Sequence, residues 1–330
     1  MTSHEHAAGL VSTWLLTGGA GYIGAHVARA LLDSGRGVVV LDDLSTGVRS
    51  RVPEGAAFVE ASVLDTDAVR AALTSYDVSG VIHLAAKKAV GESVEQPLLY
   101  YRENVGGMVS LLDAMALADV SNLVYSSSAA VYGDPAWSPI SEDTPCAPLS
   151  PYGETKLIGE WMVRDQARAR GLSWVSLRYF NVAGAGSPDL GDTSANNLIP
   201  MVFDALDRGE QPQVFGTDYP TPDGSCIRDY IHVVDLASAH VASAQLCEGG
   251  DAAAVFNVGR GIGASVWEVM AAVSEVVGRD VDAEAVGRRP GDPPELVAMV
   301  DRIRADLGWS ASHDLHDMVA SAWSARPDPV

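Results

Sequence analysis

The chain has 330 residues, and its 43 Asp and Glu against 22 Lys and Arg give a formal net charge of −21 at pH 7. That length is enough for a large buried core and predicts two lobes. The negative charge argues against nucleic acid and anionic membranes as partners. No run of about 18 uncharged apolar residues is present, so the sequence predicts no membrane span.

Residues 1–11 lack the apolar segment of a signal peptide, and we expect them to form a flexible leader. The three cysteines, Cys146, Cys226 and Cys247, are far apart and odd in number. This pattern suits a reducing environment and predicts neither a disulfide framework nor a metal site. We therefore expect a cytoplasmic protein without a metal ion.

A glycine-rich turn at residues 18–24 follows the apolar run at residues 14–17. A helical pattern comes next, and a second buried strand at residues 38–41 ends at Asp42. In this order the glycines let the backbone approach a pyrophosphate at a helix N-terminus, and the acid binds ribose hydroxyls. Asp42 would repel a 2′-phosphate, and Asp43 follows it instead of an arginine, so the motif predicts NAD rather than NADP.

Further strand-like runs lie at residues 81–84, 123–126 and 174–177, with helical patterns between them. This alternation predicts a parallel sheet with helices on both faces, which is the α/β, Rossmann-like doubly wound fold. Ligands bind beyond the C-terminal ends of such strands. His83 and His232 lie in apolar strand contexts, and we expect both to have structural roles.

Tyr152 and Lys156 lie four residues apart in a helical pattern, so their side chains share one face. A phenol titrates near pH ~10 in water, and a neighbouring cation favours the phenolate and lowers its pKa. The pair is therefore a candidate general base, and a surface tyrosine beside a solvated lysine is the alternative. The glycine-rich turn upstream favours the functional interpretation. Lys87 and Lys88 are the only other lysines in the chain.

After Asn181 the composition changes, and Gly, Pro, Asp and Asn dominate several stretches. We predict an NAD-binding domain at residues 12–181 and a smaller C-terminal α/β substrate lobe at residues 182–330. We expect the chain to return to the first domain near residues 228–258. A very acidic protein that binds an anionic ligand needs local cations. The candidates are Arg178, Arg228, Arg288 and Arg289.

Several motifs together resemble the extended short-chain dehydrogenase/reductases and, within them, the UDP-glucose 4-epimerase family. Those shared by the superfamily are residues 17–24, 126–133 and 150–156. Those more specific to the epimerases are residues 88–93 and 215–232, and the resemblance continues through residues 178–181, 196–200 and 289–292. It implies an isomerase that uses NAD to oxidise a UDP-sugar to a 4-keto sugar, lets the sugar turn, and reduces it again. UDP-galactose and UDP-glucose would interconvert in this way.

The resemblance also implies residue roles. Tyr152 is the catalytic base, Lys156 its electrostatic partner and ribose anchor, and Ser128 hydrogen-bonds the reacting oxygen of the sugar. Asn104 matches the helix-disrupting asparagine of the superfamily. The implied cofactor contacts are Gly18, Gly21, Tyr22, Ile23, Gly24, Asp42, Asp43, Ser45, Ser62, Val63, Leu84, Ala85, Ala86, Lys88, Asn104, Tyr152, Lys156 and Phe180. The implied UDP-sugar contacts are Lys88, Ser128, Tyr152, Tyr179, Asn181, Asn197, Leu198, Val214, Phe215, Arg228, Arg289, Asp292 and Leu296.

Four positions depart from the family pattern. Ser62 stands where an Asp usually binds the adenine amino group, which predicts weaker adenine recognition. Leu84 replaces a common Phe, and Glu103 stands where Asn is common. Leu296 lies where a bulky Tyr excludes N-acetyl sugars and a small residue admits them. A leucine leaves the choice between UDP-galactose and UDP-N-acetylgalactosamine open.

Three alternative functions differ from this one in the residues that they need. A nucleotide-sugar 4,6-dehydratase needs a carboxylate after the strand, and Ser128, Ala129 and Ala130 supply none. A uronate epimerase or decarboxylase needs a cation for the C6 carboxylate, and the sequence leaves that possibility open. A non-catalytic NAD-sensing protein would commonly lack Tyr152 or Lys156, and both are present.

Two helical patterns carry apolar stripes, at Leu111, Leu112 and Met115 and at Leu157, Trp161 and Met162. Such stripes ordinarily face the core. Exposed stripes on two neighbouring helices would instead form a two-fold helical interface, and we expect a homodimer of this kind.

Overall fold

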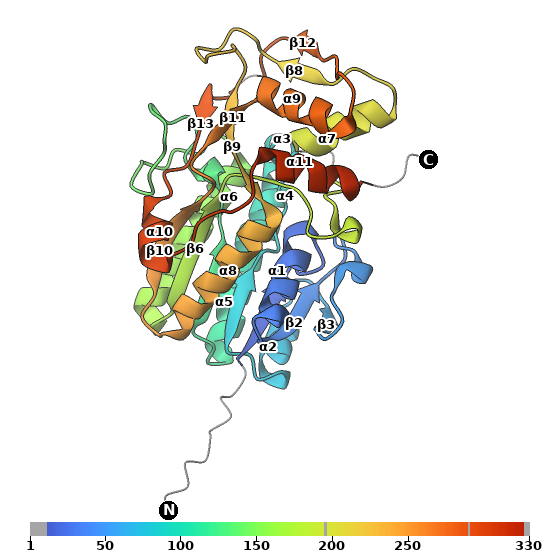
Figure 1. Ribbon diagram of the computed structural model, residues 1–330. Helices are drawn as coiled ribbons and strands as arrows, with labels where there is room; N and C mark the ends of the chain where they lie inside the picture. Colours follow the sequence, from blue (N-terminus) through green and yellow to red (C-terminus); the bar gives the residue numbers. More distant parts are fainter. Residues whose placement is uncertain (1–11, 195–196, 290, 327–330) are drawn as a thin grey trace, which may run out of the picture.

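The computed structural model describes residues 12–194, 197–289 and 291–326 (Figure 1). Parallel strands form one seven-stranded sheet in the order β10-β6-β5-β4-β1-β2-β3. These strands are β1 (Thr13–Thr17), β2 (Gly37–Asp42), β3 (Ala57–Glu60), β4 (Gly80–His83), β5 (Asn122–Ser126), β6 (Ser173–Tyr179) and β10 (Ala253–Val258). The predicted strand runs overlap β2, β4, β5 and β6, and the doubly wound α/β fold is confirmed. The leader expected at residues 1–11 lies outside the described residues.

Helices cover both faces of this sheet. One face packs against α1 (Tyr22–Asp33), α8 (Val233–Glu248) and α10 (Asp301–Leu307). The other packs against α2 (Thr66–Ser75), α5 (Gly106–Leu117) and α6 (Pro151–Arg170). Two short helices, α3 (Val90–Glu95) and α4 (Pro97–Tyr100), precede α5. The sheet is therefore buried on both sides, and its strands can be apolar along their whole length.

The apolar stripe of α5 lies in the core. Leu111, Leu112 and Met115 are all buried against the sheet, so they cannot form a surface interface, and the core interpretation is confirmed for them. On α6, Leu157 is buried whereas Trp161 keeps 47% of its surface exposed. Only part of the second stripe is therefore at the surface.

The second lobe lies beyond the C-terminal ends of the large sheet, at the top of Figure 1. Its strands are β7 (Asn181–Ala183), β9 (Ile227–His232), β11 (Gly263–Ser265) and β13 (Glu295–Leu296), with β8 (Gln213–Phe215) paired to β12 (Glu284–Val286). Its helices are α7 (Leu198–Asp207), α9 (Val266–Val277) and α11 (Leu315–Ser324), which share one apolar core.

The chain returns to the large sheet through α8 and β10. β9 pairs with β7, β11 and β13 in the small sheet, and only α8 and β10 rejoin the first domain. β10 takes the free edge of β6, and both α8 and β10 lie within the expected range, residues 228–258. α10 packs on the same face of the large sheet as α8.

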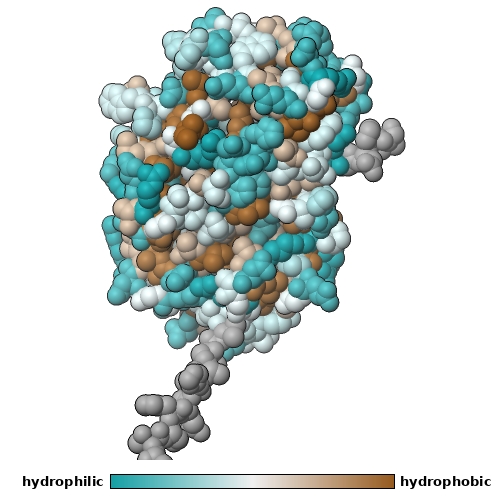
Figure 2. Space-filling view, viewed as in Figure 1, coloured by the Kyte–Doolittle hydropathy of each residue, from teal (hydrophilic) through white to brown (hydrophobic). Residues whose placement is uncertain are grey.

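One face of the molecule shows a mixture of hydrophilic and apolar side chains (Figure 2). The hydrophilic side chains spread over both lobes, with apolar patches between them. Cys146, Cys226 and Cys247 are free thiols. Among the described residues, no helix has the length and apolar character needed to cross a membrane.

Candidate active site

The glycine-rich turn brings β1 against the segment that follows β4. Gly18 has φ 72°, and a Cβ atom there would lie 2.8 Å from the Ala85 backbone nitrogen. A Cβ on Gly24 would lie 2.3 Å from the Gly18 carbonyl oxygen. Both positions therefore require glycine.

The turn presents the N-terminus of α1 without a competing group. Gly21 is the N-cap residue, and within the described part of the chain no side chain caps this helix and no acid lies in its first turn. Free backbone N–H groups and the helix dipole favour an anion at this point. The predicted contacts Tyr22 and Ile23 supply backbone N–H groups here, whereas the Tyr22 hydroxyl donates to the Gly184 carbonyl at 2.5 Å. These residues fit the pyrophosphate of a dinucleotide.

Asp42 lies at the end of β2, as predicted, and is buried. Its carboxylate accepts hydrogen bonds from the backbone N–H groups of Ala20 at 3.0 Å and Leu44 at 2.9 Å. Burial raises its pKa, and the two hydrogen bonds act in the opposite direction. A carboxylate has about four acceptor sites, so Asp42 can still accept from ribose hydroxyls. Asp43 is exposed and accepts from the Ser45 N–H at 2.9 Å.

The expected cofactor contacts Ser62 and Val63 follow β3, the strand that pairs with β2. β2 pairs with β3, and Asp42 lies opposite Glu60 in the register. Ser62 follows β3, and its hydroxyl oxygen accepts from the Leu64 N–H at 3.2 Å. Val63 lies against Gly107 of α5, where an added Cβ would meet it at 2.8 Å. The substitution at Ser62 leaves a hydroxyl at this edge of the sheet, which can still accept a hydrogen bond.

Asn104 joins two segments of the site. It lies in a π-helical turn, Tyr101–Val105, which agrees with its expected role as a helix-disrupting residue. Its Oδ1 accepts from the Lys87 N–H at 2.8 Å, and its Nδ2 donates to the Lys87 carbonyl and to Thr155 Oγ1, each at 3.0 Å. Leu84, Ala85 and Ala86 precede Lys87 in the chain. Lys88 follows Lys87, and its Nζ lies 3.4 Å from Ser194 Oγ.

Tyr152, Lys156 and Ser128 are brought together at the C-terminal end of β5. Ser150 caps α6 and Pro151 occupies its first turn, so Tyr152 lies at the start of the helix. All three side chains are buried. Lys156 Nζ donates to the Ser126 carbonyl at 2.8 Å and lies 5.9 Å from the centre of the Tyr152 ring. The Ser128 hydroxyl accepts from the Ala130 N–H at 3.1 Å.

Burial controls the protonation of this group. It raises the pKa of Tyr152, and the Ser128 hydroxyl opposes that effect. It also lowers the pKa of Lys156 to about 8. In the protein alone, desolvation acts against the phenolate that the Lys156 ammonium would favour.

The structure also contains a buried ion pair near Tyr152, Lys156 and Ser128 that the sequence analysis did not predict. Glu160 accepts from Arg178 Nε at 2.8 Å and from Arg178 Nη2 at 2.6 Å. Arg178 is therefore committed to Glu160, and its proposed role as a cation for an anionic ligand is wrong. The spacing in the sequence could have indicated that Glu160 belongs to the site, because Glu160 lies four residues after Lys156 on the same helix face.

Some of the expected UDP-sugar contacts lie in the second lobe. Asn181, Asn197 and Leu198 line one small pocket together with Tyr230, although they are far apart in sequence. Tyr179 and Phe180, at the end of β6, lie between this pocket and the Tyr152 group in chain order. The pocket thus combines two amide side chains with apolar walls.

Arg228 and Leu296 lie opposite each other on paired strands of this lobe. Arg228 Nη2 donates to Asp292 Oδ1 at 2.8 Å. Leu296 packs in an apolar cluster with Phe180 and Tyr132, beside the helix that carries Tyr152. The predicted contacts Arg228, Asp292 and Leu296 are therefore brought together.

Phe215 and Arg289 form a second pair, with the guanidinium 3.8 Å from the centre of the ring. Arg288 instead pairs with Asp218 at 2.7 Å. Val214, also a predicted contact, is wholly buried in the core of the second lobe. Its side chain cannot reach a ligand, so a contact by Val214 must use its backbone.

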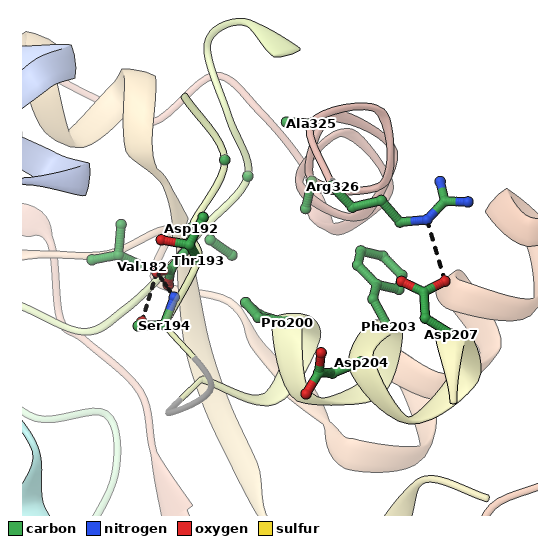
Figure 3. A pocket seen from close by; sticks show the side chains of 14 residues that line it. Val182, Asp192, Thr193, Ser194, Pro200, Phe203, Asp204, Asp207, Ala325 and Arg326 are labelled. Atoms are coloured by element: carbon green, nitrogen blue, oxygen red, sulfur yellow. Dashed lines mark hydrogen bonds and ion pairs between the residues drawn. The ribbon is translucent and has the colours of Figure 1, made fainter. Parts of the chain in front are cut away.

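A larger cavity, of about 140 Å³, adjoins the small pocket of this lobe, and both are lined by Val182, Ala183 and Pro200. Figure 3 shows Asp192 and Thr193 on one wall and Phe203 on another, with the Asp207–Arg326 ion pair nearby. None of the predicted contacts is among its lining residues. The candidate chemistry therefore lies outside this cavity.

Comparison with known proteins gives one consistent family. Residues 14–259 match the NAD dependent epimerase/dehydratase family. The chain is 48% identical to a UDP-glucose 4-epimerase of Azospirillum brasilense, over 94% of this chain and 90% of that protein. It is 44% identical to a UDP-glucose 4-epimerase of Corynebacterium glutamicum, over 94% of each.

Solved structures agree with these relatives. A UDP-glucose 4-epimerase from Brucella ovis in complex with NAD superposes with a TM-score of 0.91 at 43% identity, covering 94% of this chain and 97% of that one. One from Stenotrophomonas maltophila, with bound NAD and formylated UDP-arabinopyranose, has a TM-score of 0.91 at 38% identity, covering 95% and 97%. This chain belongs to the NAD dependent epimerase/dehydratase family.

Proposed function

We propose that this protein interconverts UDP-galactose and UDP-glucose with NAD as its bound cofactor. The observation that carries the proposal is the buried group of Tyr152, Lys156 and Ser128 at the sheet end, facing a lobe that supplies Arg228 and Leu296. The name shared by relatives at 48% and 44% identity over nearly the whole chain supports the same reaction.

NAD would be held by the first domain. The uncapped N-terminus of α1 suits the pyrophosphate, Asp42 the adenine ribose, and Lys156 the nicotinamide ribose. Bound NAD⁺ supplies a hydride acceptor for C4′ of the sugar and a positive charge beside the phenol.

Tyr152 is proposed to take the proton of the sugar's 4′-hydroxyl and to return it to the epimeric alcohol. Its Oη must be deprotonated for this step, and the Lys156 ammonium favours that form. The Ser128 hydroxyl hydrogen-bonds the reacting oxygen. Because the site is buried, these polar contacts are stronger than they would be in water.

The second lobe is proposed to hold the UDP group while the 4-keto sugar turns over. Arg228 and Arg289 would bind the diphosphate through charge-assisted hydrogen bonds, and Asn181 and Asn197 would bind next to them. Binding energy from this remote group retains the intermediate without fixing the sugar ring. Hydride can then return to the opposite face of C4′.

N-acetylated UDP-sugars and UDP-uronates remain alternative substrates of the same chemistry. Leu296, which packs beside Phe180, is proposed to border the C2 substituent. A leucine is smaller than a tyrosine, so partial turnover of N-acetyl sugars is expected.

We also propose that the protein is a cytoplasmic homodimer. α5 and α6 pack side by side, and apolar side chains remain exposed on them and on α4, namely Val109, Trp161 and Leu98. Pairing of this surface with a second copy would bury them in a two-fold interface. Sedimentation should then give twice the mass of the chain, and Trp161→Arg should yield the monomer. A monomeric parent protein would rule the dimer out.

The substrate is tested with a panel of UDP-galactose, UDP-N-acetylgalactosamine and UDP-galacturonate, each incubated with the purified protein without added cofactor. Product analysis should show UDP-glucose formed fastest. Denaturing the protein should release close to one NAD(H) per chain. Release of NADP(H), or faster turnover of the uronate, would refute the proposal as stated.

A further inference from the structure

The Glu160–Arg178 ion pair holds both ends of the segment that carries Ser128. At one end, Glu160 Oε1 accepts from Ser127 Oγ at 2.5 Å, directly before Ser128. At the other end, Arg178 Nη1 donates to the Tyr132 hydroxyl at 3.0 Å. Between them, the 3₁₀ turn Ala129–Val131 is capped by Ser128 itself.

The pair also fixes this segment to the helix of the base. Glu160 lies four residues beyond Lys156 and eight beyond Tyr152, which places all three on one face of α6. Both charged side chains are buried, at 6% and 7% side-chain exposure, and the contact is bidentate. Such a contact fixes direction as well as distance.

Stability alone is a poor reason for this arrangement. Removing two charges from water costs free energy that their attraction barely recovers, and apolar replacements are often neutral or stabilising. A hydroxyl in an active site, by contrast, has to be held within about 0.5 Å of its productive position. The ion pair satisfies that need for Ser128.

We propose that Glu160 and Arg178 are positioning residues, which set the Ser128 hydroxyl relative to the Tyr152 phenol through Ser127 and Tyr132. Neither charged group touches the sugar or takes part in proton transfer. The inference rests on the proposed function of the Tyr152 group, because it assigns the support of that group's serine.

Two variants test it without breaking the buried ion pair. Ser127→Ala removes the hydroxyl that Glu160 holds, and Tyr132→Phe removes the one that Arg178 holds. Each should lower kcat for UDP-galactose about tenfold, which corresponds to about 1.4 kcal/mol. The Kd for UDP and the content of bound NAD should stay at parent values, because both variants keep the side chains that are proposed to bind UDP and NAD.

A double-mutant cycle separates positioning from a general structural role. When Ser128→Ala is already present, Ser127→Ala and Tyr132→Phe should have no further effect on kcat, since the hydroxyl they position is gone. Ser176→Ala on β6 is the matched control. Its Oγ is buried with no hydrogen-bond partner among the described residues, so its loss should leave kcat unchanged.

The proposal is overturned if both single variants keep kcat within twofold of the parent. It is also overturned if each variant lowers kcat by the same factor with Ser128→Ala present as without it. The ion pair would then affect kcat by a route other than Ser128. Turnover by the parent protein is measured first. A parent protein that does not convert UDP-galactose would refute the proposed function. The positioning role is judged separately, by comparing kcat between the variants.

Discussion

At the scale of single residues, burial acts against ionisation of the Tyr152 phenol, and the Ser128 hydroxyl opposes that effect. Burial raises its pKa, and the nearest cation, Lys156, has its ammonium bound to the Ser126 carbonyl and 5.9 Å from the ring centre. Burial therefore acts against the phenolate in the protein alone. A second positive charge beside the phenol, such as that of NAD⁺ in the proposed complex, would favour the phenolate.

Lys156→Met tests the electrostatic role of the lysine. Methionine keeps the length of the side chain and removes the charge, so the pKa of Tyr152 should rise. Because the active form is the phenolate, the acidic limb of the kcat/KM profile should move to higher pH, and turnover at pH 7 should fall sharply. The measurement is the initial rate between pH 6 and 10. An unchanged acidic limb would show that Lys156 does not influence the phenol.

Leu296 is the residue proposed to decide between plain and N-acetylated sugars. One or two carbons in an apolar pocket are worth about 1–3 kcal/mol. Leu296→Tyr should therefore reduce turnover of UDP-N-acetylgalactosamine by about 10- to 100-fold, and Leu296→Ala should raise it. UDP-galactose serves as the internal control and should change little. Equal factors for both sugars would mean that Leu296 has only a packing role.

At the scale of elements, the sequence predicts the first domain well and the second poorly. Residues 14–42 are predictable because strand, glycine turn, helix and acid follow one another within one βαβ unit, where local spacing fixes the contacts. The Tyr152 helix is predictable for the same reason. The ends of β2, β4 and β5 then place Asp42, Ala85 and Ser128 along one edge of the sheet.

The errors come from contacts that connect distant segments. Nothing near Arg178 in sequence indicates that its partner is Glu160 on another element. The place of β9 in the small sheet depends on β7, β11 and β13, which are as short as two or three residues and carry little periodic signal. The resemblance places Val214 near the substrate, but its burial in the second core depends on packing that only the structure shows.

At the scale of elements, the testable prediction concerns Arg228 on β9. Its side chain is mostly buried beside Asp292, so removing it should leave the proposed diphosphate site with one cation fewer. Hydrogen bonds to charged groups are worth about 1.5–3 kcal/mol. Arg228→Ala should therefore weaken binding of UDP and UDP-galactose in parallel, by about 10- to 100-fold, and leave bound NAD in place.

Arg208→Ala is the control for this change. Arg208 lies in the same lobe at the end of α7, and its ion pairs with Asp204 and Glu210 are exposed. UDP affinity, measured by calorimetry, should be unchanged in that variant. If the Arg228→Ala protein binds UDP as tightly as the parent, the anchor lies elsewhere and the substrate class has to be revised.

At the scale of the whole molecule, the two lobes are joined next to the glycine turn. The Tyr22 hydroxyl donates to the Gly184 carbonyl, and the Gly186 N–H donates to His26 Nε2 at 2.8 Å. Arg51 donates to the Gly191 carbonyl at 2.7 Å. The segment that leads to the proposed UDP contacts is thus held by the domain proposed to bind NAD.

Net charge sets the response of the folded chain to salt. At a net charge of −21, the excess carboxylates of the folded chain repel one another. The Debye length falls from about 30 Å at 0.01 M to about 10 Å at 0.1 M salt, so screening should relieve this repulsion. We expect the Tm to rise by several degrees between 0.01 and 0.3 M NaCl, and equally with KCl. Scanning calorimetry would contradict this if the Tm stayed constant or fell.

The central claim is that hydride leaves C4′ of the sugar and returns to the same carbon within one protein molecule. UDP-galactose labelled with deuterium at C4′ tests it directly, in ordinary water and without added cofactor. The product UDP-glucose should retain the label at C4′ when analysed by NMR or mass spectrometry. In Tyr152→Phe the same product should form at least about 10²- to 10⁴-fold more slowly, since the base is lost. UDP-glucose that carries solvent hydrogen at C4′ would contradict the account.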